Sequence, residues 1–173
     1  MEQQRPSFAS NEVALFRVRS PNGAGKTTVI SMLTGLEQPS DGSATICGFD
    51  IETQIRLVHK VIGVCPQFDK LWPELSVRQH LVFYALLKGT PRAGAELVAR
   101  QLAESVQLDG DAYGKLASKL SGGEKRRLSI AIALAGSPPV TFFDEPTTGT
   151  VTDPPLATAQ SGRLCVALSH CTW

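Results

Sequence analysis

The stretch SPNGAGKTT at residues 20–28 limits the possible folds of this chain more than any other part of its sequence. It matches the phosphate-loop pattern G-x-x-x-x-G-K-[ST] at Gly25, Lys26 and Thr27. Ser20 stands where the pattern has its first glycine. The stretch therefore predicts a turn that binds phosphate groups, with one departure at its first position.

The residues on either side of this turn favour a strand–loop–helix unit. VALFRV (13–18) has the composition of a strand, and TTVISMLTGL (27–36) has apolar residues at helical spacing. In such a unit, successive backbone N–H groups and the helix N-terminus face the same anion. A surface turn that contains Gly-Lys-Thr by chance remains an alternative, so other motifs must decide.

Apolar runs alternate with helical patterns along the rest of the chain, which predicts an α/β fold with a largely parallel sheet. The middle of the sequence, at about 75–119, has the three- and four-residue spacing of helices, and 121–136 predicts another helix. The expected strands lie at 13–18, 43–47, 61–65, 140–144 and 163–169.

Composition excludes several classes of protein. The net charge is +1, so no overall field attracts nucleic acid, and the short basic run at 125–127 is explained by a solvated helix face. No apolar stretch approaches the roughly 18 residues of a membrane span, and MEQQRPSFASNE at the start has no signal-peptide core.

Cysteines give no sign of a metal site. The four cysteines form no C-x-x-C pair and no zinc-finger spacing with histidine. We expect Cys47 and Cys65 to be buried strand residues, and Cys165 and Cys171 lie near the C-terminus. His59 and His80 belong to no motif and are expected on a helical or loop surface.

Two acids end the strand-like run VTFFDEP at 140–146. Asp144 is expected at the C-terminal end of a strand, where a carboxylate can bind Mg²⁺. Glu145 follows directly and could polarise an attacking water. Two solvated acids at a strand end are the alternative.

Two further stretches add polar groups. LSGGEKRR (120–127) places Ser121, Gly122 and Gly123 at a predicted helix start, which is another anion-binding surface or an ordinary serine cap. In CPQFD (65–69), Gln67 follows a buried strand and could ligate Mg²⁺ or a water, although such a glutamine is usually only surface.

Taken together, these motifs resemble the nucleotide-binding domain of ATP-binding cassette (ABC) transporters. The order is that family's order: SPNGAGKTT, CPQFD, LSGGEKRRLSIAIALAG and VTFFDEPTTG. GLEQPSDGSATICGFDI and IGVCPQFDKLWPELSVRQHL look most like the A subfamily, whose members typically move lipids. The resemblance implies a P-loop NTPase-type fold, mostly parallel, with helices on both faces and a helical subdomain at about 75–119.

The resemblance also implies site residues for ATP and Mg²⁺. Nucleotide contacts are implied for Ser20, Pro21, Asn22, Gly23, Ala24, Gly25, Lys26, Thr27 and Thr28. Mg²⁺ contacts are implied for Thr27, Gln67 and Asp144, and Glu145 would be the general base. Ser121, Gly122 and Gly123 would contact the γ-phosphate on a second domain, and His170 is a candidate switch histidine.

The same resemblance implies partners and a place in the cell. Such domains work in pairs with two ATP molecules between them, and the transmembrane domains would be supplied elsewhere. No nucleic-acid partner is expected. A transporter domain of this kind acts at the cytoplasmic face of a membrane, and this chain itself is expected to have neither a transmembrane segment nor a signal peptide.

The chain departs from the family at its ends. We expect a loose lead-in at 1–12, the nucleotide-binding domain at 13–149, and a divergent tail at 150–173. Phe8 and Phe16 are the upstream aromatic residues, and neither is assigned to adenine. A serine at position 20 costs about 1 kcal/mol if φ is positive there, which weakens nucleotide binding about fivefold.

Two other functions stay open at this stage. A soluble cassette ATPase working on ribosomes or DNA would need a second cassette or strong basic patches. A truncated remnant would bind nucleotide weakly and hydrolyse none.

Overall fold

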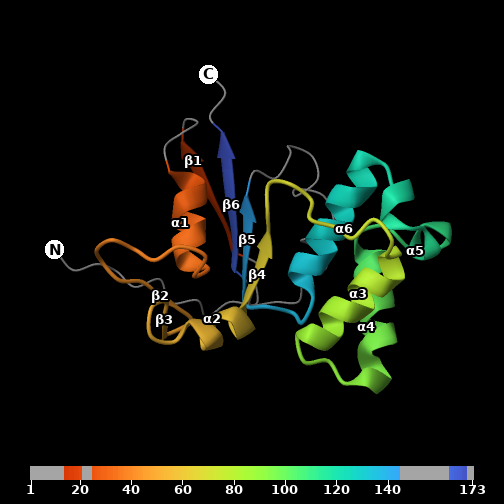
Figure 1. Cartoon of the computed structure of the whole chain (residues 1–173), viewed down its shortest axis with the longest axis horizontal. Helices are drawn as coiled ribbons and strands as arrows, with labels where there is room; N and C mark the ends of the chain where they lie inside the picture. The colour runs from red at the N-terminus through yellow and green to blue at the C-terminus, as the bar shows by residue number, and fades with distance from the viewer. Residues whose placement is uncertain (1–13, 21–24, 145–163, 171–173) are drawn as a thin grey trace.

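The computed structural model describes residues 14–20, 25–144 and 164–170, and of the first and last of these segments the backbone only. Its main sheet has the strand order β1 (Ala14–Ser20), β6 (Leu164–His170), β5 (Val140–Asp144) and β4 (Ile62–Cys65). All neighbouring strands in it are parallel, so their carboxyl ends share one edge (Figure 1). That edge is where ligands bind in open parallel α/β sheets.

Strand β5 shows how the sheet is covered on both faces. Its residues are all buried, and successive side chains point to opposite faces. Phe142 packs in one apolar cluster with α1 (Lys26–Leu33), α2 (Ile55–Val61) and the small hairpin of β2 (Thr45–Ile46) and β3 (Phe49–Asp50). Phe143 packs in the other cluster, with α6 (Gly122–Leu134). The predicted two-sided parallel sheet is confirmed.

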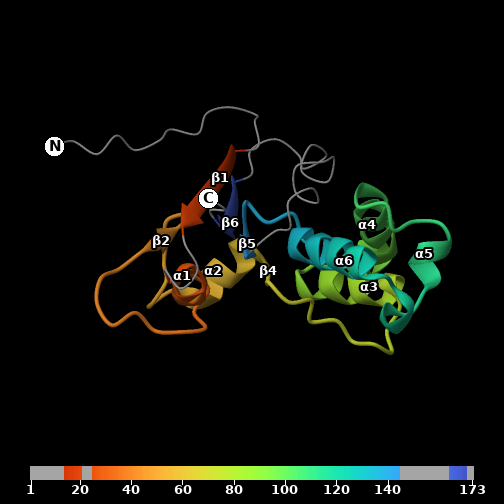
Figure 2. The same cartoon turned by 90° about the horizontal axis from the view of Figure 1, so that it is seen from above.

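The remaining helices gather with α6 beside β4, and we call α3 to α6 the helical group (Figure 2). It contains α3 (Val77–Leu87), α4 (Arg92–Ser105), α5 (Asp111–Gly114) and the 3-10 turn η1 (Ala117–Lys119). Buried alanines on α4 recur every four residues, at Ala95, Ala99 and Ala103, and small side chains let helices approach closely. None of the described helices is long and apolar enough to span a membrane.

Most expected elements are present, with shifted ends. The helix expected at 27–36 ends at Leu33, because Gly35 adopts a left-handed φ of 73°. Val61, expected in a strand, is the last residue of α2. Helix α2 was not predicted from the sequence.

Two surface or burial predictions were wrong. His80 is fully buried, because it lies on the inner stripe of α3 with Val77 and Leu81. Cys47 is exposed in the turn between β2 and β3, where its φ of 52° places it outside the strand. Cys65 is buried in β4, as expected.

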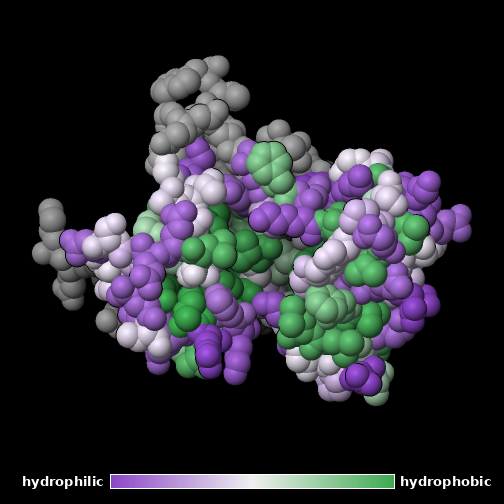
Figure 3. Space-filling view, viewed as in Figure 1, coloured by the Kyte–Doolittle hydropathy of each residue, from purple (hydrophilic) through white to green (hydrophobic). Residues whose placement is uncertain are grey.

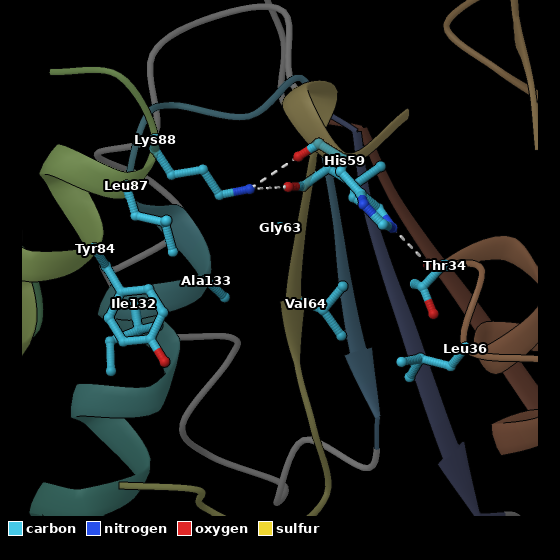
Figure 4. A pocket seen from close by; sticks show the side chains of 11 residues that line it. Thr34, Leu36, His59, Gly63, Val64, Tyr84, Leu87, Lys88, Ile132 and Ala133 are labelled. Atoms are coloured by element: carbon cyan, nitrogen blue, oxygen red, sulfur yellow. Dashed lines mark hydrogen bonds between the residues drawn. The ribbon is translucent and has the colours of Figure 1, made fainter. Parts of the chain in front are cut away.

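The helical group and the sheet meet along β4. The Lys88 ammonium donates hydrogen bonds to the carbonyl oxygens of Ile62, over 2.8 Å, and His59, over 3.1 Å (Figure 4). These contacts border a hollow of about 360 Å³, with Tyr84 on the helical side. Gly63 lies against α6, and a Cβ built on it would be 1.9 Å from the Ala133 carbonyl oxygen. Only glycine permits this approach.

Candidate functional site

The end of β1 leads toward the N-terminus of α1. Pro21, Asn22, Gly23 and Ala24, four of the predicted nucleotide contacts, lie outside the described residues. Gly25 precedes the helix with a φ of 83°, a left-handed conformation that residues with a Cβ rarely adopt. The helix begins with Lys26, Thr27 and Thr28, and first-turn N–H groups have no acceptor within a helix. This helix end is therefore suited to bind an anion.

Thr27 and Asp144, which are 117 positions apart, meet at this edge of the sheet. Thr27 lies in the first turn of α1, and Asp144 is the last residue of β5. The Thr27 hydroxyl donates a hydrogen bond to Oδ2 of Asp144 over 3.1 Å. The fold thus brings the phosphate-loop helix into contact with the predicted metal-binding acid.

The surroundings of Asp144 fit a magnesium ion. Asp144 is only 6% exposed, and its second carboxylate oxygen, Oδ1, has no hydrogen-bond partner. A buried, unpartnered carboxylate oxygen is destabilising unless a cation or donor reaches it. The described residues hold no cluster of three His, Cys, Asp or Glu side chains. Mg²⁺ often binds with one or two carboxylates, waters and phosphate oxygens, so a threonine hydroxyl and one carboxylate are an adequate protein contribution.

Gln67 follows β4 on the other side of β5 from β1. Strand β4 ends at Cys65 beside Phe143 of β5, and Gln67 comes two residues later with an exposed side chain. The predicted position at the carboxyl edge is confirmed, whereas its role as a ligand stays a prediction. Burial raises the pKa of the Cys65 thiol to about 11, although the positive charge of Arg126 acts in the opposite direction. Cys65 is therefore an inert core thiol.

Arg126 belongs to this site although its basic run was interpreted as solvated surface. Its side chain is 9% exposed. It donates hydrogen bonds to the carbonyl oxygens of Pro66, Gln67 and Asp144. The interpretation was wrong because Arg126 shares the inner stripe of α6 with Ile130, four residues later, and that spacing was the available signal.

Ser121, Gly122 and Gly123 start α6, as predicted. The Ser121 hydroxyl accepts from the Glu124 N–H over 3.2 Å, and the Glu124 carboxylate accepts from the Ser121 N–H over 2.7 Å. These hydrogen bonds hold the pKa of Glu124 below its usual range. Figures 1 and 2 place α6 on the opposite side of β4 from α1. The structure therefore does not bring Ser121 to the Lys26 site of the same chain.

The remaining predicted residues lie at the ends of described segments or beyond them. His170 is the last residue of β6, and its backbone pairs in register with Ser20, the last residue of β1. The strand expected at 163–169 is confirmed as β6, and it brings His170 to the phosphate-loop edge. Glu145 lies outside the described residues.

Comparison with known proteins points to one family. A family model described as "ABC transporter" matches residues 5–148. ABC transporter A family members 8 and 11 of Arabidopsis thaliana are 46% and 50% identical to this chain, over 83% and 78% of it. The matches cover 16% and 14% of those relatives, so the chain spans about a sixth of the length of the curated relatives it matches.

Solved structures confirm the fold. An ATP-binding cassette, solved as a dimer in a post-hydrolysis state with ADP and phosphate, has a TM-score of 0.76 at 21% identity, covering 92% of this chain and 75% of that one. The cbiO1 protein of Clostridium perfringens, part of an ABC transporter complex, has a TM-score of 0.76 at 23% identity, covering 91% and 67%. With the motif order, the parallel P-loop fold and the match over residues 5–148 in agreement, the chain belongs to the ABC transporter family.

Proposed function

We propose that this chain is the ATP-binding domain of an ABC transporter and couples ATP binding and hydrolysis to transport across a membrane. The observation that carries this proposal is the 3.1 Å hydrogen bond from Thr27 to Asp144. It joins the first turn of the phosphate-loop helix to the acid at the end of β5. A site for a magnesium nucleotide needs these two groups side by side.

The first turn of α1 would bind the phosphates. Gly25 leaves the backbone open for a close approach, and the N–H groups of Lys26, Thr27 and Thr28 would donate to phosphate oxygens. The Lys26 ammonium would add the positive charge for the β- and γ-phosphates. Pro21 to Ala24, together with Ser20 at the end of β1, would complete the turn.

Thr27, Asp144 and Gln67 would hold Mg²⁺ and the attacking water. The unpartnered Oδ1 of Asp144 supports this assignment, because a cation would satisfy it. Bound Mg²⁺ supplies positive charge that stabilises the phosphate oxygens during hydrolysis. Glu145, next in sequence to Asp144, would take the proton from water, and His170 is a second candidate for contact with the γ-phosphate.

Hydrolysis would need a second domain. Ser121, Gly122 and Gly123 lie across β4 from α1, so they would contact a nucleotide bound by another chain or domain. The capping box keeps the α6 N-terminus helical, and its dipole would face that γ-phosphate. A solved cassette of the same fold is itself a dimer.

Transport would be driven through a membrane partner at the cytoplasmic face of a membrane. Exposed apolar side chains gather over α3, including Phe83 and Leu87, with Trp72 packed edge-on against Phe83 (Figure 3). Apolar surface of this kind commonly marks an interaction site. By the sequence resemblance to the A subfamily, whose members typically move lipids, the transported substrate would be a lipid.

Binding of a fluorescent ATP analogue to the purified chain tests the nucleotide site directly. We expect saturable binding with Mg²⁺ and a loss of affinity of more than tenfold in Lys26→Ala, since its ammonium pairs with phosphate. Lys60→Ala is the matched control. Lys60 lies on α2, which directly precedes the start of β4, whereas the nucleotide site lies at the carboxyl ends of the strands. Equal affinity in wild type and Lys26→Ala would refute the site.

Transport coupling needs a separate experiment. Co-expression with the transmembrane half of an A family transporter should give a complex whose ATPase rate rises in lipid vesicles and falls with Glu145→Gln. Nucleotide binding without any turnover in that complex would instead favour a remnant that binds but does not hydrolyse. Recovery with ribosomes or DNA would favour a soluble cassette ATPase.

A further inference from the structure

Arg126 is a charged side chain in an unusual place. It lies in the second turn of α6, and its side chain is 9% exposed. Taking a guanidinium out of water is unfavourable unless its N–H groups find acceptors. The acceptors that Arg126 finds therefore show what its burial accomplishes.

Among the described residues, those acceptors belong to two separate segments. Nη1 donates to the carbonyl oxygens of Pro66 and Gln67, the latter over 3.4 Å, and lies 3.5 Å from Oδ1 of Asp69. Nη2 donates to the carbonyl oxygen of Asp144 over 3.2 Å. One planar group thus joins the loop after β4, the end of β5 and helix α6.

We propose that Arg126 is a positioning residue for the magnesium-nucleotide site. Its guanidinium sets the position of the Gln67 loop and of the Asp144 backbone relative to α6. This inference rests on the proposed function and extends it to a residue that would touch neither nucleotide nor metal.

Geometry links Arg126 to both parts of the site. The Asp144 carbonyl that it holds belongs to the residue whose carboxylate accepts from Thr27. On the other side, Arg126 lies five positions after Ser121, about 7.5 Å along a helix. A shift of α6 on contact with a second domain's nucleotide would therefore move the Gln67 loop and Asp144 together.

Arginine suits this task better than lysine. Its fork has fixed directions and two edges, so it can bind two segments at once with little further loss of freedom. A lysine ammonium of similar reach has a single nitrogen on a flexible stem. Arg126→Lys should therefore keep the charge and lose part of the positioning.

Two substitutions of Arg126 and two comparison variants separate positioning from plain stability. Arg126→Gln removes the charge and replaces the guanidinium with a shorter amide group. Arg126→Lys keeps the charge. Asp69→Asn removes the ion pair and leaves the carbonyl acceptors in place. Lys125→Gln is the matched control, since it removes the same charge one position away on α6. All variants are made in the whole chain and checked for folding by circular dichroism.

The first measurement is affinity for a fluorescent ATP analogue, with Mg²⁺ and with EDTA. For Arg126→Gln we expect a loss of about tenfold with Mg²⁺ and less than about twofold in EDTA. The difference arises because α1 and Lys26 bind phosphate without help from Gln67 or Asp144. Arg126→Lys should lose about threefold with Mg²⁺, and Asp69→Asn and Lys125→Gln less than about twofold.

The second measurement is amide hydrogen exchange of residues 66–70 without nucleotide. Exchange should be faster in Arg126→Gln and unchanged in Lys125→Gln, because the Arg126 guanidinium donates hydrogen bonds to the carbonyl oxygens of Pro66 and Gln67 in that loop. This readout does not depend on nucleotide binding. It therefore stays decisive even if the wild-type chain fails to bind ATP, which would refute the proposed function.

Three results would overturn the role of Arg126. One is wild-type Mg²⁺-dependent binding in Arg126→Gln. Another is a loss of affinity for the ATP analogue in Arg126→Gln that is equal with Mg²⁺ and with EDTA, since a residue with a purely structural role would give that result. The third is unchanged exchange of residues 66–70. If Arg126→Gln does not fold, the same comparisons are decided by Arg126→Lys.

Discussion

Strand β4 is tied to the helical group by a basic side chain at each end, and the two ties differ. At its start, Lys88 donates to the carbonyls of Ile62 and His59, which belong to one continuous segment. Just past its end, Arg126 donates to Pro66 through Nη1 and to Asp144 through Nη2. Lys88 borders an open hollow, whereas Arg126 is almost entirely enclosed.

This difference separates stability from control of the site. An ammonium on a flexible stem can fasten one segment to the helical group, and solvent can replace it. A buried guanidinium fixes two segments that carry predicted Mg²⁺ ligands, Gln67 and Asp144. We therefore expect the Arg126 end of β4 to govern nucleotide binding, and the Lys88 end to add modest stability.

The largest expected effect lies between the two ties, at Gly63. Gly63→Ala would place a Cβ 1.9 Å from the Ala133 carbonyl oxygen, and backbone cannot yield as a flexible side chain can. The free energy of unfolding should fall by about 3 kcal/mol or more, measured by urea denaturation. Gly94→Ala in α4 is the control, since the nearest atom to its Cβ is 3.8 Å away. A Gly63→Ala protein as stable as wild type would show that β4 and α6 do not pack as described.

Arg126→Met should have the next largest effect on stability. It leaves the Asp144 and Pro66 carbonyls without their donor in a buried site, which costs about 2–3 kcal/mol. Arg100→Met, at an exposed ion pair with Glu96, should cost less than about 0.5 kcal/mol. If urea denaturation gave the same loss of free energy of unfolding for Arg126→Met and Arg100→Met, the burial of Arg126 would not contribute to stability.

The strands and most helices could be predicted because local pattern and packing agree. VTFFD has a buried strand's composition, and it is buried on both faces in β5. Helix α2 was missed because only Val58 of its residues is buried, so no strong apolar stripe marks it. The boundaries at 1–12, 13–149 and 150–173 stay predictions.

The site was harder to predict where residues act through backbone contacts. Thr27 and Asp144 belong to known motifs, so their meeting at 3.1 Å could be expected. Arg126 belongs to no catalytic pattern, and its acceptors are mainly carbonyl oxygens, which every residue has. The four-residue spacing from Arg126 to Ile130 could have indicated that Arg126 is buried. Its acceptors could not have been predicted, because they depend on how β4, β5 and α6 come together.

Lys88→Met should show the weaker tie. Burial lowers the pKa of Lys88, so desolvation of its charge offsets part of what its two hydrogen bonds contribute. Methionine retains the apolar stem, and the free energy of unfolding should fall by only about 1 kcal/mol. The Mg²⁺ dependence of nucleotide binding should not change, in contrast to Arg126→Gln. Lys60→Met on α2 is the control, and a changed Mg²⁺ dependence in Lys88→Met would remove the distinction between the two ends.

Mild acid offers the gentlest test, because it acts on the loop between β4 and α3 while leaving Arg126 charged. His80 Nε2 accepts from the Trp72 N–H over 3.0 Å, and Nδ1 lies 2.9 Å from the Ser76 carbonyl oxygen, so the neutral ring carries its proton on Nδ1. Burial lowers the pKa of His80.

The folded-state pKa of His80 lies below the unfolded value of about 6.5, so the folded protein favours the neutral ring. The stability that neutral His80 contributes is therefore present above about pH 6.5 and is lost as the pH falls through the folded-state pKa. One proton gives a slope of at most about 1.4 kcal/mol per pH unit. Urea denaturation of wild type and His80→Gln between pH 7.5 and 5 measures the difference, which should shrink on acidification. A difference that is constant with pH would mean that His80 does not take up a proton on unfolding.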